Sequence, residues 1–511
     1  MSRTVRASIA AGFAYVNVGI SIIAGLWLVP FTLHHVGARS YGLWLASGEL
    51  LAYAGIAELG MLVTLPWLIA QADGQGDRAR MRQLVATGAA AASLSAVVYA
   101  GLALLLWTQL PRIVQLGDAE RSGVQGPLLI VAVAGCLTHP MRVFNAVLAG
   151  LQDVRFNGFV SLTNWLIGFA LSVSLLTSGY GLYALAIAAA VPSLVTGVAG
   201  AIRLARLAPD LLRDWPRPSL PDIRRLFLEG VGAWIGGWGW RLVAASDSLV
   251  LAALGRPGQV AALACTSKLG QAMTQLSWIP CDNGLIGLAQ LSAEGQQRRL
   301  RDALVVMVRV YLTLAGAVAC VIVAVNGAFV REWVGPAMFA GATANLLIAA
   351  LAVAMSFAHA VAVIPSVLGR RLAIGVATMI CGVLHLGLAW LLGTRFGVTG
   401  VVAAGVISHG VVFSALAWKP FADATGTTEI SLLSDVLVPW GARMLPMLLL
   451  AFAVQRIAGT PALPVTIATG VLVAATVLFY MRPLYIEFGP VRSLYERVTR
   501  SWRTAEGGVQ S

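Results

Sequence analysis

Four polar side chains recur within residues 260–291, a stretch that is otherwise mostly apolar. They are Lys268, Gln271, Gln275 and Asp282. At these spacings a helix places all four on one face. A membrane helix with a single polar stripe turns that stripe away from lipid. The stripe therefore either lines a cavity, where it would bind a polar or charged substrate, or forms buried polar packing between helices.

Aromatic and basic side chains form a second candidate site within residues 226–254. Trp234, Trp238 and Arg241 follow one another at helical spacing. Aromatic faces stack on sugars, and an arginine binds phosphate through two parallel hydrogen bonds. In the alternative interpretation the tryptophans pack inside a helix bundle, and Arg241 pairs with Asp247 or a neighbouring acid.

Further charges lie inside apolar stretches, where they are costly and usually functional or paired. Arg142, within residues 127–150, either receives a pyrophosphate or extends to the membrane surface. A carboxylate in such a place either couples transport to H⁺ or Na⁺ or is a plain salt-bridge partner. The candidates for ion coupling or gating are Glu49, Glu58, Asp247 and Asp282. Glu49 and Glu58 point to opposite faces of a straight helix, so they share a surface only if the helix bends near Gly60.

The composition shows which elements must position these residues. Of 511 residues 58% are hydrophobic and only 11% are charged, whereas a soluble domain carries about 25% charge. Apolar runs long enough to cross a bilayer recur throughout, so we expect an all-α polytopic membrane protein. Its fourteen predicted spans are residues 7–31, 42–70, 84–110, 127–150, 156–176, 181–204, 226–254, 260–291, 303–330, 342–368, 372–392, 400–418, 435–458 and 463–480.

The distribution of Lys and Arg predicts the orientation. With the N-terminus inside, the inner segments hold 23 basic residues and the outer loops hold 7. This excess places both termini in the cytoplasm. The net charge of +13 therefore reflects membrane topology, and no nucleic-acid partner is expected.

The two halves of the chain resemble each other at an offset of about 219 residues. GDRARMR at 76–82 matches GQQRRLR at 295–301. Glycines at equivalent turns keep nearly the same register, namely Gly37 with Gly255, Gly150 with Gly369 and Gly181 with Gly400. We expect two parallel six-helix repeats around a central cavity, followed by two extra helices. In this register Lys268 corresponds to Glu49, and we expect the two to approach each other across the cavity in one state. The predicted parts are an N-terminal lobe (1–204), a cytoplasmic connector (205–225), a C-terminal lobe (226–418), the extra helices (419–481) and a basic amphipathic cytoplasmic tail (482–511).

Several motifs in order resemble the polysaccharide branch of the multidrug/oligosaccharidyl-lipid/polysaccharide exporter superfamily, the O-antigen and exopolysaccharide flippases. They are VGARSYGLW (36–44), AELG (57–60), GQGD (74–77), VLAGLQDVRFNG (147–158) and Asp247 before VLAALG (250–255). AELG carries Glu58 where the family has an aspartate. The resemblance covers nearly the whole chain.

The resemblance implies a flippase that works by alternating access in a bacterial inner membrane, with both termini cytoplasmic. The implied cargo is an undecaprenyl-pyrophosphate-linked oligosaccharide for surface polysaccharide. A coupling ion, H⁺ or Na⁺, and a polysaccharide polymerase of the same pathway are the other partners to consider, and a monomer is expected.

Three rivals remain open. A cation-coupled drug antiporter of the same fold typically has twelve helices and an acid in its first helix. A lipid II flippase typically has arginines there, and residues 7–31 contain neither. A membrane-bound polymerase or ligase usually carries a large outer loop. The sequence contains no P-loop, GxSxG, HExxH or metal-spaced cluster, so we expect no enzyme, cofactor or metal site.

Overall fold

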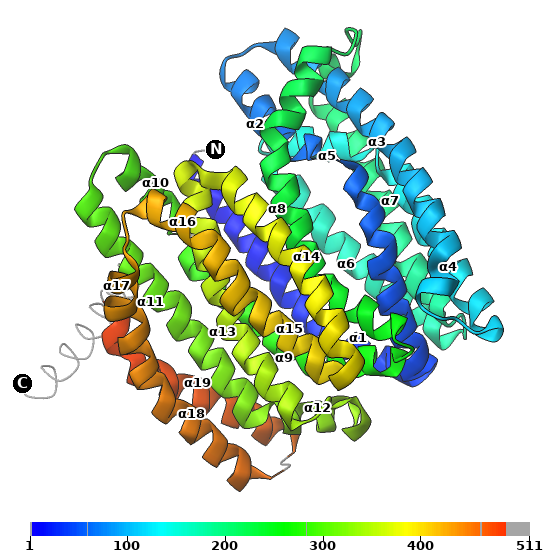
Figure 1. Ribbon diagram of the computed structural model, residues 1–511. Helices are drawn as coiled ribbons and strands as arrows, with labels where there is room; N and C mark the ends of the chain where they lie inside the picture. The colour runs from blue at the N-terminus through cyan, green and yellow to red at the C-terminus, as the bar shows by residue number, and fades with distance from the viewer. Residues whose placement is uncertain (1–2, 59, 283, 460–461, 487–511) are drawn as a thin grey trace, which may run out of the picture. The chain divides into compact units, whose positions relative to one another are not determined.

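The computed structural model describes residues 3–58, 60–282, 284–459 and 462–486, and the regular structure in these ranges is entirely helical (Figure 1). The predicted all-α class is thus confirmed. The chain forms two compact units, Met1–Ala261 and Ala262–Ser511, each described separately below. The predicted basic tail helix lies mostly beyond residue 486, outside the described residues.

Unit one is built from long helices joined by short turns. Its elements are α1 (Arg3–Ala52), η1 (Tyr53–Glu58), α2 (Met61–Gly74), α3 (Arg78–Ile113), α4 (Asp118–Thr138), α5 (Arg142–Gly150), α6 (Val154–Thr177), α7 (Leu182–Leu207), η2 (Pro209–Leu212) and α8 (Leu220–Ala253). α1 contains the predicted span 7–31 and the first part of the predicted span 42–70, because it continues past a kink at Gly37. α8 packs on α1, α2 and α3, so its contacts place it in unit one. The predicted division into lobes at the connector follows the sequence repeat instead and stays a prediction.

The core of unit one lies where α2, α3, α5 and α8 meet. Leu65, Met81, Leu148 and Leu226 are all almost fully buried there. Apolar side chains from four helices fill one space, which fixes the helices against one another. Figure 1 shows these elements packed together at one end of the unit.

The connector between α7 and α8 is packed rather than loose. Its prolines end α7 and allow only the short turn η2, since proline cannot continue a helix. Leu211 is buried in the core of unit one. Arg80 donates two hydrogen bonds, of 2.8 and 2.7 Å, to the carboxylate of Asp222. The Arg80 guanidinium holds the pKa of Asp222 below its usual value. The connector thus fastens the start of α8 to α3.

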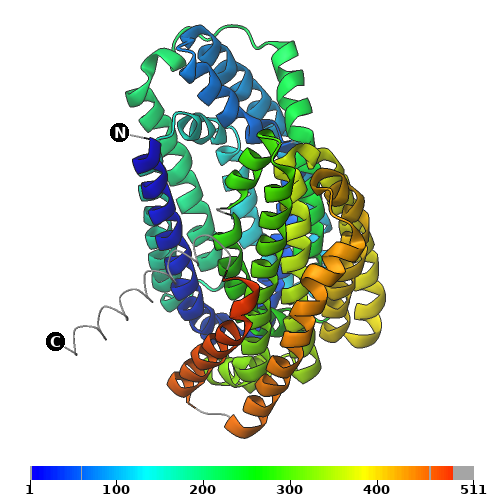
Figure 2. The ribbon, with the colours of Figure 1, turned by 90° about the vertical axis from the view of Figure 1, so that its left-hand side faces the viewer.

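Unit two is organised around one deeply buried helix, α11. The elements are α9 (Pro257–Asp282), which crosses the unit boundary, α10 (Leu285–Ala293), α11 (Gln297–Val321), η3 (Ile322–Asn326), α12 (Gly327–Val334), η4 (Pro336–Met338), α13 (Ala342–Pro365), η5 (Ser366–Arg370), α14 (Arg371–Phe396), α15 (Val398–Ile407), η6 (Ser408–Phe413), α16 (Ser414–Thr425), α17 (Glu429–Leu432), η7 (Leu433–Leu437), α18 (Val438–Ala458), α19 (Leu463–Met481) and η8 (Arg482–Leu484). α13, α18 and α19 all pack on α11. The last two lie side by side in both ribbon views (Figures 1 and 2).

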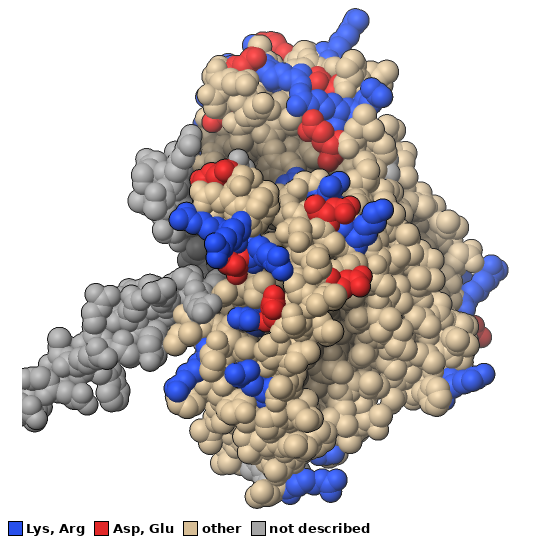
Figure 3. Space-filling view, turned by 60° about the vertical axis from the view of Figure 1, so that its left-hand side comes forward, with Lys and Arg blue, Asp and Glu red and all other residues tan. Residues whose placement is uncertain are grey.

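Ten helical stretches of the described chain are long and apolar enough to cross a membrane. One of them, Gly19–Glu58, overlaps the predicted spans 7–31 and 42–70, and another, Ala342–Phe396, contains the predicted spans 342–368 and 372–392. α8 and α9 correspond to the two remaining predictions. Large apolar side chains point outward, among them Val383 on α14 (57% exposed) and Val471 on α19 (65% exposed). On the face shown in Figure 3 most of the surface is uncharged, and the charged side chains gather in a few groups. Such a surface suits lipid, and the protein is a multi-pass membrane protein.

Backbone angles test the repeat at its turns. Gly76 and Gly295 both have φ of 70°, at the predicted offset of 219. Gly37 (φ 77°) and Gly255 (φ 73°) also match. Gly181, however, shares its φ and ψ with Gly397 (56°, −129° and 58°, −132°), not with Gly400. The register therefore shifts by three residues at this turn.

Candidate functional site

The site lies in unit one, at a break in the predicted span 42–70. The helix ends at Ala52, tightens into η1 and restarts at Met61 after Gly60, which has φ of 70°. Gly60 faces Gly230 on α8 across a backbone contact. A Cβ added at Gly60 would lie 2.7 Å from the carbonyl oxygen of Gly230, and the reverse contact is closer still. Only glycine fits on either side, so α8 is pressed against the break.

The break positions Glu58 against Arg142. A guanidinium nitrogen of Arg142 donates to Glu58 at 2.5 Å. Glu58 is well covered, with 15% of its side chain exposed, whereas Arg142 is 52% exposed. The acid therefore holds the arginine in place while about half of the arginine side chain stays accessible. An arginine held in this way suits a phosphate or pyrophosphate ligand.

A second break places Arg142 at the start of α5. The predicted span 127–150 is interrupted between Thr138 and Arg142, at Pro140. His139 anchors this break, because its ring stacks on Tyr99 with centroids 5.1 Å apart and its Nε2 lies 2.9 Å from the hydroxyl of Ser95. The orientation of Arg142 thus depends on a rigid, buried contact behind it.

Glu58 and Arg142 line a cavity of about 490 Å³. Its polar wall consists of Thr138, Asn145, Ser193 and Thr196, and its apolar wall includes Leu62, Val63 and Pro66. A cavity with a charged pair, several hydroxyl groups and an apolar wall can hold an amphipathic ligand, polar at one end and apolar at the other. The sequence analysis missed these four polar residues, since Ser and Thr scattered over three helices give no periodic signal.

Arg241 on α8 and Glu49 near the end of α1 form a looser pair. Their closest contact is 3.4 Å, and both side chains are more than a third exposed. The guanidinium also lies over the ring of Trp238 at 5.9 Å. Its buried Nε has no hydrogen-bond partner among the described residues. Because the Arg241–Glu49 ion pair is long and partly exposed, Arg241 can exchange the Glu49 carboxylate for another anion.

The tryptophans of α8 pack on the broken segment. Trp234 donates its indole N–H to the carbonyl of Ile56 at 3.3 Å, and Trp238 lies 6.0 Å from the ring of Tyr53. These contacts agree with the packing interpretation of both rings. Arg241 pairs with Glu49, one of the neighbouring acids, and Asp247 lies half-buried further along α8. The bend that would let Glu49 and Glu58 act together is present.

The polar stripe of α9 lies in unit two and is divided. Gln271 and Gln275 are exposed and Lys268 is half-buried. Asp282, at the end of α9, instead turns into unit two, where it accepts a hydrogen bond from Tyr311 at 2.5 Å and lies 3.0 Å from Nε2 of His359. The sequence analysis missed these partners, because they follow Asp282 by 29 and 77 residues and form no spacing pattern.

Comparison with known proteins agrees with this architecture. Residues 77–280, which include Arg142 and Arg241 but not Glu58, match the family described as "Polysaccharide biosynthesis protein". No curated protein sequence gives a significant match.

Three solved structures share the fold. An inward-facing multidrug resistance MATE family transporter of the MOP superfamily is 16% identical, with 81% of this chain and 96% of that chain covered and a TM-score of 0.59. The lipid II flippase MurJ, in an inward closed conformation, is 13% identical, with 93% and 99% covered and a TM-score of 0.63. An outward-facing MATE transporter is 17% identical, with 80% and 96% covered and a TM-score of 0.51.

At these identities the structures show that the chain shares the fold of the MATE and MurJ proteins. The family match covers residues 77–280, less than half of the chain.

Proposed function

We propose that this protein is a flippase that moves an undecaprenyl-pyrophosphate-linked oligosaccharide from the cytoplasmic to the periplasmic leaflet of a bacterial inner membrane. The observation that carries the proposal is the family match at residues 77–280 in a chain with a transporter fold. The product would feed surface or exopolysaccharide synthesis. A polymerase of that pathway is the expected downstream partner, and both termini are expected in the cytoplasm.

The chemistry of unit one supports a lipid pyrophosphate as ligand. Arg142 is presented by Glu58 at the edge of a cavity with one polar and one apolar wall. A pyrophosphate can take over the exposed N–H groups of Arg142, the sugars can bond to the hydroxyl wall, and the isoprenoid can follow the apolar wall. Arg241 would bind a second phosphate oxygen or a sugar acid in a later state.

Lys268, Gln271 and Gln275 remain predicted substrate contacts on α9. Glu49 would then gate access by holding or releasing Arg241. In this scheme the substrate exchanges one anionic partner of each arginine for another, so no arginine is left unpaired during the cycle.

A gene deletion separates this function from its rivals. We expect the deletion strain to lose surface polysaccharide and to accumulate lipid-linked oligosaccharide that a membrane-impermeant lectin cannot reach from the periplasm. Plasmid-borne wild-type protein should restore both. Increased drug sensitivity with intact polysaccharide would indicate the antiporter instead. Cell lysis with accumulated lipid II would indicate a lipid II flippase. Polysaccharide precursors that reach the periplasm but stay unpolymerised or unligated would indicate the enzymatic rival.

A further inference from the structure

One cluster of titratable side chains in unit two has no role in the substrate site described above. Asp282 ends α9, Tyr311 belongs to α11 and His359 to α13. The hydroxyl of Tyr311 and Nε2 of His359 both approach the same carboxylate oxygen, Oδ1 of Asp282. Three helices thus meet at one carboxylate.

An aromatic ring and a carboxylate enclose the imidazole of His359. The ring of Trp278 lies flat on the imidazole, with centroids 4.1 Å apart and planes 5° apart. An aromatic face attracts a cation placed over it. Trp278 itself is fixed, because its indole N–H donates to the hydroxyl of Ser356 at 3.0 Å. The imidazole is therefore held between an aromatic face and a carboxylate.

The ligand set suits a proton better than a metal cation. The Asp282 carboxylate is contacted by one oxygen, the hydroxyl of Tyr311, and by one nitrogen, Nε2 of His359. Na⁺, by contrast, needs several oxygen ligands around it. Among the described residues no group of three or more His, Cys, Asp or Glu could hold a metal ion. The titratable groups near Asp282 are His359, Tyr311 and the adjacent Cys281.

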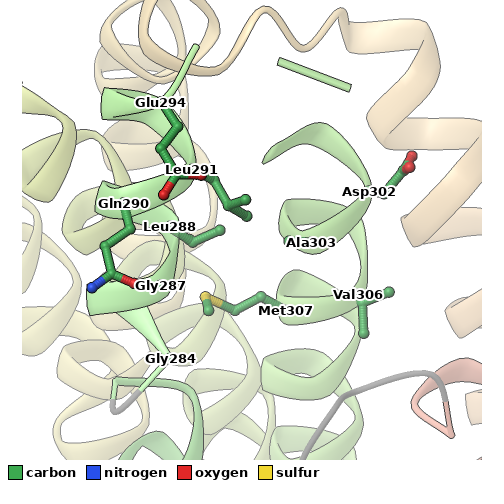
Figure 4. A pocket seen from close by; sticks show the side chains of 10 residues that line it. All are labelled: Gly284, Gly287, Leu288, Gln290, Leu291, Glu294, Asp302, Ala303, Val306 and Met307. Carbon is green, nitrogen blue, oxygen red and sulfur yellow. The ribbon is translucent and has the colours of Figure 1, made fainter. Parts of the chain in front are cut away.

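A cavity of about 590 Å³ between α10 and α11 leads toward this cluster. Its lining runs from Glu294, at the end of α10, to Gly284 and Met307. Figure 4 shows Met307 reaching from α11 toward α10, with Glu294 at the opposite end of the same space. Asp282 lies two residues before Gly284, and Tyr311 lies one turn after Met307. Cys281 also contacts the Met307 carbonyl at 3.9 Å, so the end of the cavity that Gly284 and Met307 line adjoins the cluster.

We propose that Asp282 and His359 form one proton-binding site, and that the cavity between α10 and α11 is the aqueous path that loads and unloads it. Water in the cavity delivers a proton, and the pair changes from a net charge of −1 to 0. The proton returns along the same path. The first turns of α11, next to the cavity, carry Arg298, Arg299 and Arg301, so the charge rule assigns the mouth of the cavity to the cytoplasm.

Protonation would act where α9 ends. Asp282 is its last residue, and α10 begins at Leu285. A change of charge at this junction alters the strength of the contacts that hold Asp282, at the end of α9, to His359 and Tyr311. This role rests on the proposed function, because α9 also carries the predicted substrate contacts Lys268, Gln271 and Gln275.

The binding step can be tested without transport. Purified full-length protein in detergent is titrated from pH 8 to pH 5, and the fluorescence of the Trp278→Phe variant is subtracted to isolate Trp278. We expect a single proton-dependent quenching step, since an imidazolium stacked on an indole quenches its emission. His359→Asn should abolish the step and Asp282→Asn should shift it to lower pH. Asp423→Asn, at an exposed carboxylate of α16, is the control and should leave it unchanged. An unaltered step in His359→Asn, or a step abolished by Na⁺ at constant ionic strength, overturns the proton site.

The path is tested by thiol labelling in membranes. A Cβ at Gly287, on the cavity wall, or at Gly387, on an exposed face of α14, meets no atom within 4 Å. A charged, membrane-impermeant thiol reagent should label Gly287→Cys in inside-out vesicles and not Gly387→Cys. Equal labelling of both, or of neither, contradicts a water-filled path.

Failure of the proton site and failure of the flippase function give different results. In proteoliposomes, acidification of the side that corresponds to the cytoplasm should accelerate flipping by wild-type protein at least tenfold, whereas acidification of the opposite side should have no effect. Asp282→Asn should lose this acceleration but keep slow flipping down the substrate gradient. A wild-type protein that titrates normally but flips no lipid-linked oligosaccharide refutes the proposed function and leaves the proton site standing.

Discussion

Glu58 and Arg142 are 84 residues apart in the sequence, yet their side chains meet at 2.5 Å. Each lies beside a helix break, Glu58 before Gly60 and Arg142 after Pro140. Two interrupted helices thus bring one covered acid and one accessible base to the edge of the same cavity. Discontinuous membrane helices often build substrate sites in this way, because their free ends and bends admit polar groups.

A charge exchange separates substrate binding from simple pairing at this position. Arg142→Gln should reduce flipping at least tenfold, since it removes a charge-assisted contact worth about 1.5–3 kcal/mol. The double variant Glu58→Arg, Arg142→Glu restores the pair but moves the cation to the covered position. We expect it to recover thermal stability and not transport. Recovered transport in the exchanged protein would assign the pair a structural role only.

The contact between Gly60, at the N-cap of α2, and Gly230 of α8 should be intolerant of any side chain. Gly230→Ala places a methyl group against the backbone of Gly60, and such overpacking costs about 1–3 kcal/mol. We expect a fall of several degrees in the unfolding temperature of the detergent-solubilised protein. Gly237→Ala on the same helix meets no atom within 4 Å and is the matched control. Equal stability of the two variants would mean that the helices separate freely at this contact.

Arg241 should depend on the shape of its head group as well as on its charge. Arg241→Lys keeps the charge and loses the planar, two-pronged donor. The expected result is a roughly tenfold higher KM for lipid-linked substrate, equivalent to about 1.4 kcal/mol, with little change in maximal rate. Arg225→Lys, in an exposed pair with Glu229 on the same helix, serves as the control. An unchanged KM would leave Arg241 as a partner of Glu49 alone.

The attachment of the connector should weaken in acid. The pKa of Asp222 is lowered by the Arg80 guanidinium, so the pair contributes its full stability above the ordinary aspartate pKa of about 3.9 and loses it as pH falls through the lower folded value. Asp222→Asn should destabilise the protein by about 1–2 kcal/mol at pH 7 and flatten this acid dependence. The comparison is made by thermal unfolding between pH 3 and pH 7. Asp210→Asn, at an exposed connector residue, should behave as wild type.

Hydropathy alone predicted the helices, because a span of twenty apolar residues has few other structures in lipid. It could not predict where Glu58 or Arg142 would point. Gly60 raised the possibility of a bend, but the 3₁₀ turn before it depends on contact with Gly230, 170 residues later in the chain. Likewise, helical spacing predicted that Asp282 shares one polar face with Lys268. In the structure Asp282 instead contacts His359 and Tyr311 inside unit two.

The repeat was predictable at its turns and less so between them. Gly76 and Gly295 share a backbone angle because each lies in a short turn between one helix and the basic start of the next. The match of Gly181 with Gly400 was wrong by three residues, since Gly397 carries the equivalent conformation. Sequence identity of single glycines cannot fix such a register. The backbone angle that requires glycine can fix it.

The central claim is tested most directly by flipping in a purified system. The protein is reconstituted into liposomes whose inner leaflet alone carries undecaprenyl-pyrophosphate-linked oligosaccharide, and exposure of the glycan outside is followed with a lectin. We predict exposure within minutes for wild-type protein and at least tenfold slower exposure for Arg142→Gln, with Arg225→Lys unaffected. Exposure no faster than in protein-free liposomes, or an equal rate for Arg142→Gln, would contradict the account.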